Sequence, residues 1–330
     1  MNKKTLIIAL CILLTSIIFA LFSIFSVGFK RGSNLAGQLV FAHTSTQGAH
    51  LDKVVITTPQ STTTLQLQNG FWLVNEGNNY YANMALTNAL FTGMNKSRYF
   101  TQIDTQGREL SEFFLNTPQT NNQNSGTLIQ TYAQDKILDE VLIGGTTADN
   151  IYTFVRKPHD NDIWLINNDF TIPQKTYSWF QQPLLNYAPQ QIKSFETQVN
   201  NQNIIYKRMR PADDFMSQEG KSETLRTLSE AFNYMTFNNV VKNTDFDITQ
   251  YPNQHNLQIT LFNGLVTTMD IYADRDLKNF WTSIKISANR LPTLGVNDYI
   301  KNNEFLYDGW IFQLSPEIGN ILYKSFDMKK

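Results

Sequence analysis

The stretch LQITLFNGLVTTMDIY, residues 257–272, carries the strongest folding signal in the chain. Its two halves, 257–262 and 265–272, are rich in β-branched and aromatic residues, which favour strands. The dipeptide Asn263-Gly264 separates them, and Asn-Gly between two such runs is the strongest short signal for a β-hairpin. A further run of the same kind follows at 280–286. The stretch therefore predicts an antiparallel sheet.

The residues before this hairpin predict two more strands and a helix. Residues 192–197 and 204–208 are β-rich runs, and a helix is expected to begin at Ser222, which can cap its own N-terminus. The apolar residues of that helix recur on one face, which indicates a buried stripe. This stripe consists of Leu225, Leu228, Phe232 and Met235.

The same order of elements occurs earlier in the chain. Strands are predicted at 53–58, 63–67 and 70–74, then a helix at 82–94, then strands at 127–132, 141–144, 151–155 and 163–166. The helix has an apolar stripe of Leu86, Ala89, Leu90 and Met94. The polar stretch 116–126 is expected to be a loop. An amphipathic helix is most simply buried on its own sheet, although any α+β chain shows some self-similarity.

We therefore expect an α+β fold with two similar units of antiparallel sheet packed with amphipathic helices. The first unit is placed at 41–172 and the second at 191–315, with a connector at 173–190. Residues 316–330 are expected to form a helical tail, because Ile318, Ile321, Leu322 and Phe326 lie near one helical face. Docking of the tail on the body is favoured over contact with a partner or the membrane.

An uncharged, mostly apolar run extends from Leu6 to Phe29, between Lys3-Lys4 and Lys30-Arg31. As a helix it would reach roughly 36 Å, enough to cross a hydrocarbon core of about 30 Å. A cleaved signal peptide has a shorter apolar core, of about 7–15 residues. Residues 1–40 are therefore predicted to comprise a cytoplasmic tail, an uncleaved single-pass transmembrane anchor and the start of a tether.

The positive charges that flank this run do not set its orientation, because two Lys/Arg residues lie on each side. A very short N-terminal tail usually stays in the cytoplasm. We therefore expect the body on the outer side of the inner membrane, with the lipid bilayer as the partner of the apolar run.

Composition excludes several classes of function. The whole chain has a net charge of -1, and its first 40 residues contain only basic charges, so the body is mildly acidic and unsuited to binding nucleic acid. The only cysteine, Cys11, lies in the apolar run, which leaves the body without a disulfide or a thiolate metal site. No phosphate-binding loop, nucleophile elbow or HExxH motif is present, and Gly144-Gly145 lacks a nucleotide-binding context. We expect no catalytic activity, cofactor or metal.

Three polar clusters have alternative interpretations. His43, His50 and Asp52 contain enough ligands for an open zinc site, but their spacing is better explained by a solvated tether that enters a strand. Residues 159–162 (HDND) resemble the start of a calcium loop, but the sixth position is Leu165 instead of glycine, which favours a polar turn. Adjacent Asp213-Asp214, near the basic cluster 208–210, is expected to be ionised on an exposed turn.

Five short motifs occur in an order that resembles one bacterial family, the "domain of unknown function 4340" family, over roughly residues 50–315. They are Gly70-x-Trp72, Tyr81-Ala82-Asn83, Trp179-Phe180-x-x-Pro183-Leu184-Leu185, Phe262-Asn263-Gly264-Leu265 and Gly309-Trp310-x-Phe312. The chain has Tyr-Ala-Asn where the family more often has Pro-Ala-Asp. The resemblance implies an inner-membrane protein with a repeated α+β exported region, often accompanying ABC-transporter components of the gliding-motility type. No catalytic residues are established for the family, so none is implied.

The tryptophans allow a hypothesis about partner binding. Trp72, Trp179 and Trp310 are candidates for a partner surface, although packing in sheet–helix cores is the preferred interpretation of all five tryptophans. We expect an exported, membrane-anchored scaffold or accessory protein, such as an auxiliary subunit of an ABC-transporter-type complex. A periplasmic module that binds a glycan, lipid or peptide in the cleft between the units is the alternative. An envelope hydrolase is the least favoured.

Overall fold

The computed structural model describes residues 35–46, 50–118, 124–167, 170, 172–199, 202–217, 220–221 and 224–325. The run from Leu6 to Phe29, predicted as a membrane anchor, lies outside these residues. Within them, no helix has both the length and the apolar character needed to cross a bilayer.

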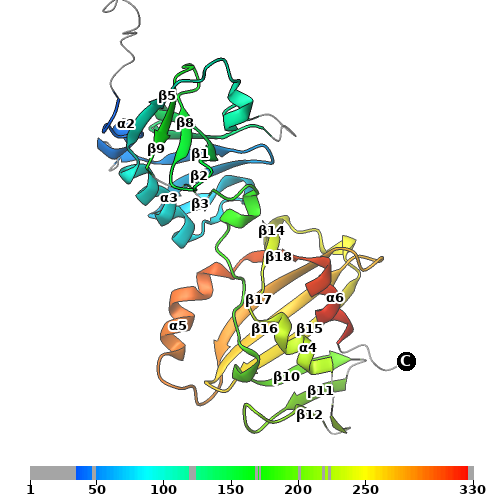
Figure 1. The fold of residues 1–330 in the computed structure, drawn as a ribbon. Helices are drawn as coiled ribbons and strands as arrows, with labels where there is room; N and C mark the ends of the chain where they lie inside the picture. The colour runs from blue at the N-terminus through cyan, green and yellow to red at the C-terminus, as the bar shows by residue number, and fades with distance from the viewer. Residues whose placement is uncertain are drawn as a thin grey trace, which may run out of the picture.

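The described residues form two nine-stranded sheets whose named strands pair only in antiparallel fashion (Figure 1). The first sheet contains β1 (Lys53–Thr57), β2 (Thr62–Gln68), β3 (Phe71–Val74), β4 (Tyr80–Tyr81), β5 (Tyr99–Ile103), β6 (Thr127–Ala133), β7 (Lys136–Thr146), β8 (Thr153–Arg156) and β9 (Ile163–Ile166). The second contains β10 (Ile192–Val199), β11 (Gln202–Lys207), β12 (Met216–Ser217), β13 (Gly220–Lys221), β14 (Phe237–Lys242), β15 (Asn253–Leu261), β16 (Leu265–Ala273), β17 (Phe280–Ala288) and β18 (Trp310–Leu314). The α+β class with two antiparallel sheets is confirmed.

One strand order is used twice. The first sheet runs β4-β3-β2-β1-β6-β7-β8-β9-β5, and the second runs β13-β12-β11-β10-β15-β16-β17-β18-β14. The edge strands β5 and β14 also share an irregularity, because the register shifts after Tyr99 in one and after Phe237 in the other. The similarity predicted between the units therefore includes the position of a bulge in the edge strand.

Each unit has a helix between its fourth and fifth strands, and these two strands lie at opposite edges of the sheet. The α-helices in the described residues are α2 (Ala42–Thr46), α3 (Met84–Lys96), α4 (Thr224–Ala231), α5 (Val296–Asn303) and α6 (Pro316–Lys324).

Asn83 caps α3 by accepting hydrogen bonds from the backbone N–H groups of Ala85 and Leu86. The helix buries Thr87, Leu90 and Met94, and Ala89 of the predicted stripe is exposed. Leu225 and Leu228 of the stripe predicted for the second helix are buried on α4. Phe232 and Met235 are also buried but lie beyond the end of this helix at Ala231, so the predicted helix was too long. Ser222 lies outside the described residues.

The connector and the tail are both packed against the sheets. Within residues 173–190, Trp179, Leu184 and Tyr187 are buried. In α6, Leu322 is buried and Gly319 lies so close to the ring of Phe280 that a Cβ would come within 2.1 Å of it. The tail as far as Lys324 is thus docked on the second sheet, and Phe326 lies outside the described residues.

Tyr80 of β4 is the centre of the contact between the two units, and it is 1% exposed. Its hydroxyl donates to the carbonyl oxygen of Leu306 at 3.1 Å. Its ring makes edge contacts with four rings from the connector and the second unit, with centroids 5.1–6.2 Å away: Phe180, Phe237, Trp310 and Phe312. One continuous hydrophobic core therefore contains residues from both sheets.

Polar contacts to the backbone fix the same junction. Asn78 donates from Nδ2 to the carbonyl oxygen of Val240 at 2.8 Å, and Gln182 donates from Nε2 to that of Phe237 at 2.8 Å. The Tyr307 hydroxyl donates to the carbonyl oxygen of Leu184 at 3.0 Å. These contacts tie the edge of the first sheet and the connector to the second sheet.

Unfolding free energy should fall as pH rises above about 10, because burial raises the pKa of Tyr80, Tyr187 and Tyr307 far above the usual value. Above that pH the unfolded chain loses phenolic protons that the folded chain retains. Each such tyrosine should cost about 1.4 kcal/mol of stability per pH unit until its folded-state pKa is reached. Urea unfolding across the alkaline range measures this slope. Tyr307→Phe should make it shallower, and a stability that stays constant through this range would contradict the prediction.

Candidate functional site

The three residues considered for a zinc site do not form one cluster in the structure. The Nδ1 atom of His43 lies 3.0 Å from Asp139 Oδ1, whereas Asp52 accepts a hydrogen bond from the backbone N–H of Gln134 at 2.9 Å. His50 is exposed. The described residues contain no group of three or more His, Cys, Asp or Glu side chains that could hold a metal ion.

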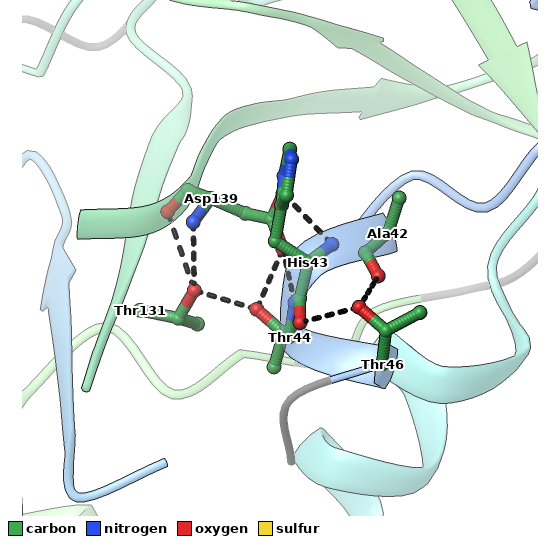
Figure 2. A network of polar contacts seen from close by, with 6 residues as sticks. All are labelled: Ala42, His43, Thr44, Thr46, Thr131 and Asp139. Atoms are coloured by element: carbon green, nitrogen blue, oxygen red, sulfur yellow. Dashed lines mark hydrogen bonds and ion pairs between the residues drawn. The ribbon is translucent and has the colours of Figure 1, made fainter. Parts of the chain in front are cut away.

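Asp139 on β7 holds α2 against the first sheet (Figure 2). Its carboxylate accepts hydrogen bonds from the backbone N–H groups of His43 at 3.4 Å and Thr44 at 2.7 Å, and from Thr44 Oγ1 at 2.7 Å. Thr44 Oγ1 also lies 2.7 Å from Thr131 Oγ1. Helices leave their first N–H groups without partners, so Asp139 caps α2 from a distant strand. The predicted tether is folded onto the first unit in this region.

The turn at 159–162 is organised by a guanidinium group. Arg156 is buried, and its Nη1 donates to the carbonyl oxygens of Lys157, Pro158 and Asp160 at 2.8–3.1 Å. Its Nε donates to the carbonyl oxygen of Leu115 at 2.9 Å. Burial lowers the pKa of this guanidinium. Carbonyl oxygens that could have faced a calcium ion are therefore occupied by Arg156.

The acidic pair 213–214 does not form a buried dyad. Asp213 accepts from the backbone N–H of Arg210 at 3.0 Å and from its Nε at 3.2 Å, within one exposed turn. Neighbouring Arg208 points inwards and donates to the carbonyl oxygens of Ile192 at 2.8 Å and Pro211 at 3.0 Å. These groups stabilise local backbone.

The candidate tryptophans lie mainly against other rings of the chain. Trp179 is 1% exposed and so offers no surface to a partner in this structure. Trp72 is partly buried, with its ring 4.8 Å from that of Phe91. Trp310 is partly buried against Tyr80. Trp179 is a core residue, in agreement with the preferred interpretation of the sequence. Trp72 and Trp310 pack against other rings but remain partly exposed.

The most exposed large apolar side chains among the described residues lie elsewhere, in the loop from β17 to α5. Leu291 is 89% exposed and Leu294 is fully exposed. We call residues 289–295 (NRLPTLG) the leucine loop. It lies at the end of the second sheet remote from the first unit (Figure 1). Sequence reasoning missed it, although two leucines beside Pro292 in a short loop were a visible signal.

The leucine loop is held in place by backbone hydrogen bonds to the turn of the Asn263-Gly264 hairpin. The backbone N–H of Asn289 donates to the carbonyl oxygen of Gly264 at 2.9 Å, and that of Thr293 donates to Asn263 at 2.8 Å. Gly264 has φ +92°, and a Cβ there would lie 2.8 Å from Pro292 Cα. Only glycine combines this backbone conformation with such a close approach. The hairpin predicted from the sequence thus supports the loop that displays both leucines.

A cavity of about 370 Å³ adjoins the loop. Its lining combines residues of the connector, the β15–β16 hairpin and the start of α5, among them Tyr187, Leu261, Leu265, Thr293, Leu294 and Tyr299. The lining of this hollow is mixed, polar and apolar. The two exposed leucines beside it add the apolar surface that is expected at a protein-binding site.

The fold and this surface define a class: an α+β protein of two like antiparallel sheets that carries an exposed apolar loop. The chain belongs to the family described as "Domain of unknown function (DUF4340)", whose family model matches residues 72–254. This confirms the resemblance found in the sequence, and the match extends from β3 across the connector into β15. Searches of curated proteins and of solved structures found no match.

Proposed function

We propose that this chain is a non-enzymatic scaffold, anchored in a bacterial inner membrane by the run from Leu6 to Phe29, with its body on the periplasmic side. Its proposed partner is a subunit of a membrane complex, of the ABC-transporter type that the family resemblance implies. The observation that carries the proposal is the leucine loop. Large apolar side chains held out in water are unfavourable, and their burial by a partner recovers roughly 1.5–3 kcal/mol each.

The junction at Tyr80 supports a scaffolding role. A scaffold must hold its contact surfaces at fixed positions, and rings from both units pack around this one side chain. The leucine loop is also fixed to the second sheet through Asn263 and Gly264. The proposed contact surface is therefore preorganised, which lowers the entropy lost on binding.

Replacing both leucines, Leu291→Ser with Leu294→Ser, should weaken partner capture about tenfold or more, which corresponds to about 1.4 kcal/mol or more. Crosslinking in native membranes, followed by affinity recovery of the chain and quantification of each crosslinked protein, measures this effect. Both side chains are exposed, so the unfolding free energy should change by no more than about 0.5 kcal/mol.

The matched control is Met84→Ser, which removes an exposed apolar side chain from α3. It should leave the crosslinked set unchanged. Recovery of the unaltered chain alone, as a monomer, would count against a scaffold. An unchanged set of partners with the doubly substituted chain would exclude the leucine loop as the contact.

A cavity at the junction, with several polar side chains in a mixed lining, favours a second candidate, a ligand-binding module. This cavity of about 380 Å³ is lined from both units and from the connector, with Glu76, Lys175, Asn238 and Asn239 among its residues. A thermal-shift screen of glycans, lipids and peptides separates the two functions. A ligand at about 100 times its Kd should add about 2.7 kcal/mol to stability, and Glu76→Gln should reduce that gain.

A further inference from the structure

The first described residues are bonded to the edge of the first sheet at β5. The backbone N–H of Gly37 donates to the carbonyl oxygen of Tyr99 at 2.7 Å, and that of Tyr99 donates to Gln38 at 3.0 Å. The backbone N–H of Val40 donates to the carbonyl oxygen of Ser97 at 3.0 Å. The chain thus joins the folded body at a fixed point on this edge.

This edge is the one remote from the second unit. The strand order places β5 at one edge of the first sheet and β4, which carries Tyr80, at the other. Eight strand spacings of about 4.8 Å separate them, about 38 Å when followed along the twisted sheet. Figure 1 accordingly shows β5 and α2 on the side of the first unit away from the second sheet.

Only residues 30–34 lie between the end of the apolar run at Phe29 and the packed residue Leu35. At no more than about 3.6 Å per residue, the six steps from Phe29 to Leu35 reach at most about 22 Å. If the run spans a bilayer, Leu35 lies within that distance of the headgroups. The sheet edge bonded to residues 37–40 then lies close to the membrane.

The side chains at this corner suit a lipid interface. Phe100 is 52% exposed and Ile151 is 59% exposed, and the rings of Phe100 and Tyr152 stack with centroids 4.7 Å apart. The exposed Arg98 donates from Nη1 to the carbonyl oxygen of Gly37 at 2.9 Å. Aromatic rings and long basic side chains concentrate at membrane interfaces, where one end is apolar and the other hydrated. We call Arg98, Phe100, Ile151 and Tyr152 the β5 corner.

We propose that the β5 corner rests on the lipid headgroups, so that the second unit and its leucine loop project away from the membrane. The inference rests on the anchoring given under the proposed function. Asp104 and Asp149 lie in turns beside the corner, so its charge is mixed. Contact should therefore depend on the apolar and aromatic side chains and occur on uncharged as well as anionic lipid.

The test uses the full chain in phosphatidylcholine vesicles that contain a lipid with a nitroxide quencher on its headgroup. With Cys11→Ser, the variants Ile151→Cys and Leu291→Cys each carry one fluorophore. Emission should be lost at residue 151 and retained at residue 291. Adding Phe100→Ser should reduce the loss at residue 151.

The outcomes of this test distinguish a failure of the inference about the β5 corner from a failure of the proposed membrane anchor. Flotation with the vesicles, without loss of emission at residue 151, would overturn the inference and leave the anchor in place. Loss at residue 291 equal to or greater than that at residue 151 would also overturn it, because the body would then lie flat or inverted. A chain that fails to float with the vesicles would overturn both.

Discussion

Replacing Tyr80 with alanine should lower the unfolding free energy by about 3–5 kcal/mol, the range found when a large buried aromatic side chain is truncated. Tyr80 is fully buried, and its ring contacts four others across the junction. The cavity left behind would be lined by side chains of both units. Because these side chains are fixed by two separate sheets, the junction cannot close over it without moving one unit. Urea unfolding measures the loss.

Two further variants test whether the loss of unfolding free energy comes from the loss of the ring contacts of Tyr80. Tyr80→Phe keeps the ring contacts and removes only the hydrogen bond to Leu306, so it should cost about 1 kcal/mol. Tyr234→Ala removes an exposed ring and should change stability by less than about 0.5 kcal/mol. A Tyr80→Ala chain as stable as the Tyr80→Phe chain would show that the ring contacts do not hold the units together.

Replacing Arg156 with methionine should cost about 3 kcal/mol, because the carbonyl oxygen of buried Leu115 and three carbonyl oxygens of a partly exposed turn would lose their donor. Methionine keeps the unbranched apolar stem of the side chain and removes the guanidinium group with its hydrogen bonds. The acceptors left behind belong to Leu115, Lys157, Pro158 and Asp160. Urea unfolding again gives the magnitude, and amide hydrogen exchange at residues 157–162 should locate the damage in this turn.

Arg156→Lys is the matched control. A lysine keeps the charge but cannot donate in the planar, forked arrangement that reaches both the Leu115 carbonyl and the turn. The loss of unfolding free energy in Arg156→Lys should therefore be smaller than that in the methionine variant, but not zero. Addition of Ca²⁺ should not restore stability to the methionine variant. Full rescue by Ca²⁺ would instead show that the turn is a calcium loop.

Local patterns predicted the long central strands well and the edge strands poorly. Residues 265–272 combine β-branched residues with an Asn-Gly turn, and they form most of β16. The strands missed are β4, β5, β12, β13, β14 and β18, which lie at the sheet edges or one place inside them. Edge strands are short and exposed on one side, so they lack the apolar pattern from which strands are recognised.

The candidate site likewise combines a local feature that the sequence predicted with tertiary contacts that it did not. The sequence places Asn263-Gly264 in a hairpin turn, and the structure agrees. It could not show that this turn supports the leucine loop, because the bonds from Asn289 and Thr293 join segments that meet only after folding. Nor could it show that Trp179 is buried while Leu291 is exposed, since exposure depends on neighbours distant in sequence.

The sequence by itself determined the α+β class, the two sheets, the family and the absence of cysteine outside the apolar run, because these follow from local pattern and composition. The tertiary structure alone decided that Tyr80 joins the units, that Asp139 caps α2 from another strand, and that the entering chain is bonded to the edge at β5. Each of these depends on contacts between residues far apart in the chain, which local propensity does not encode.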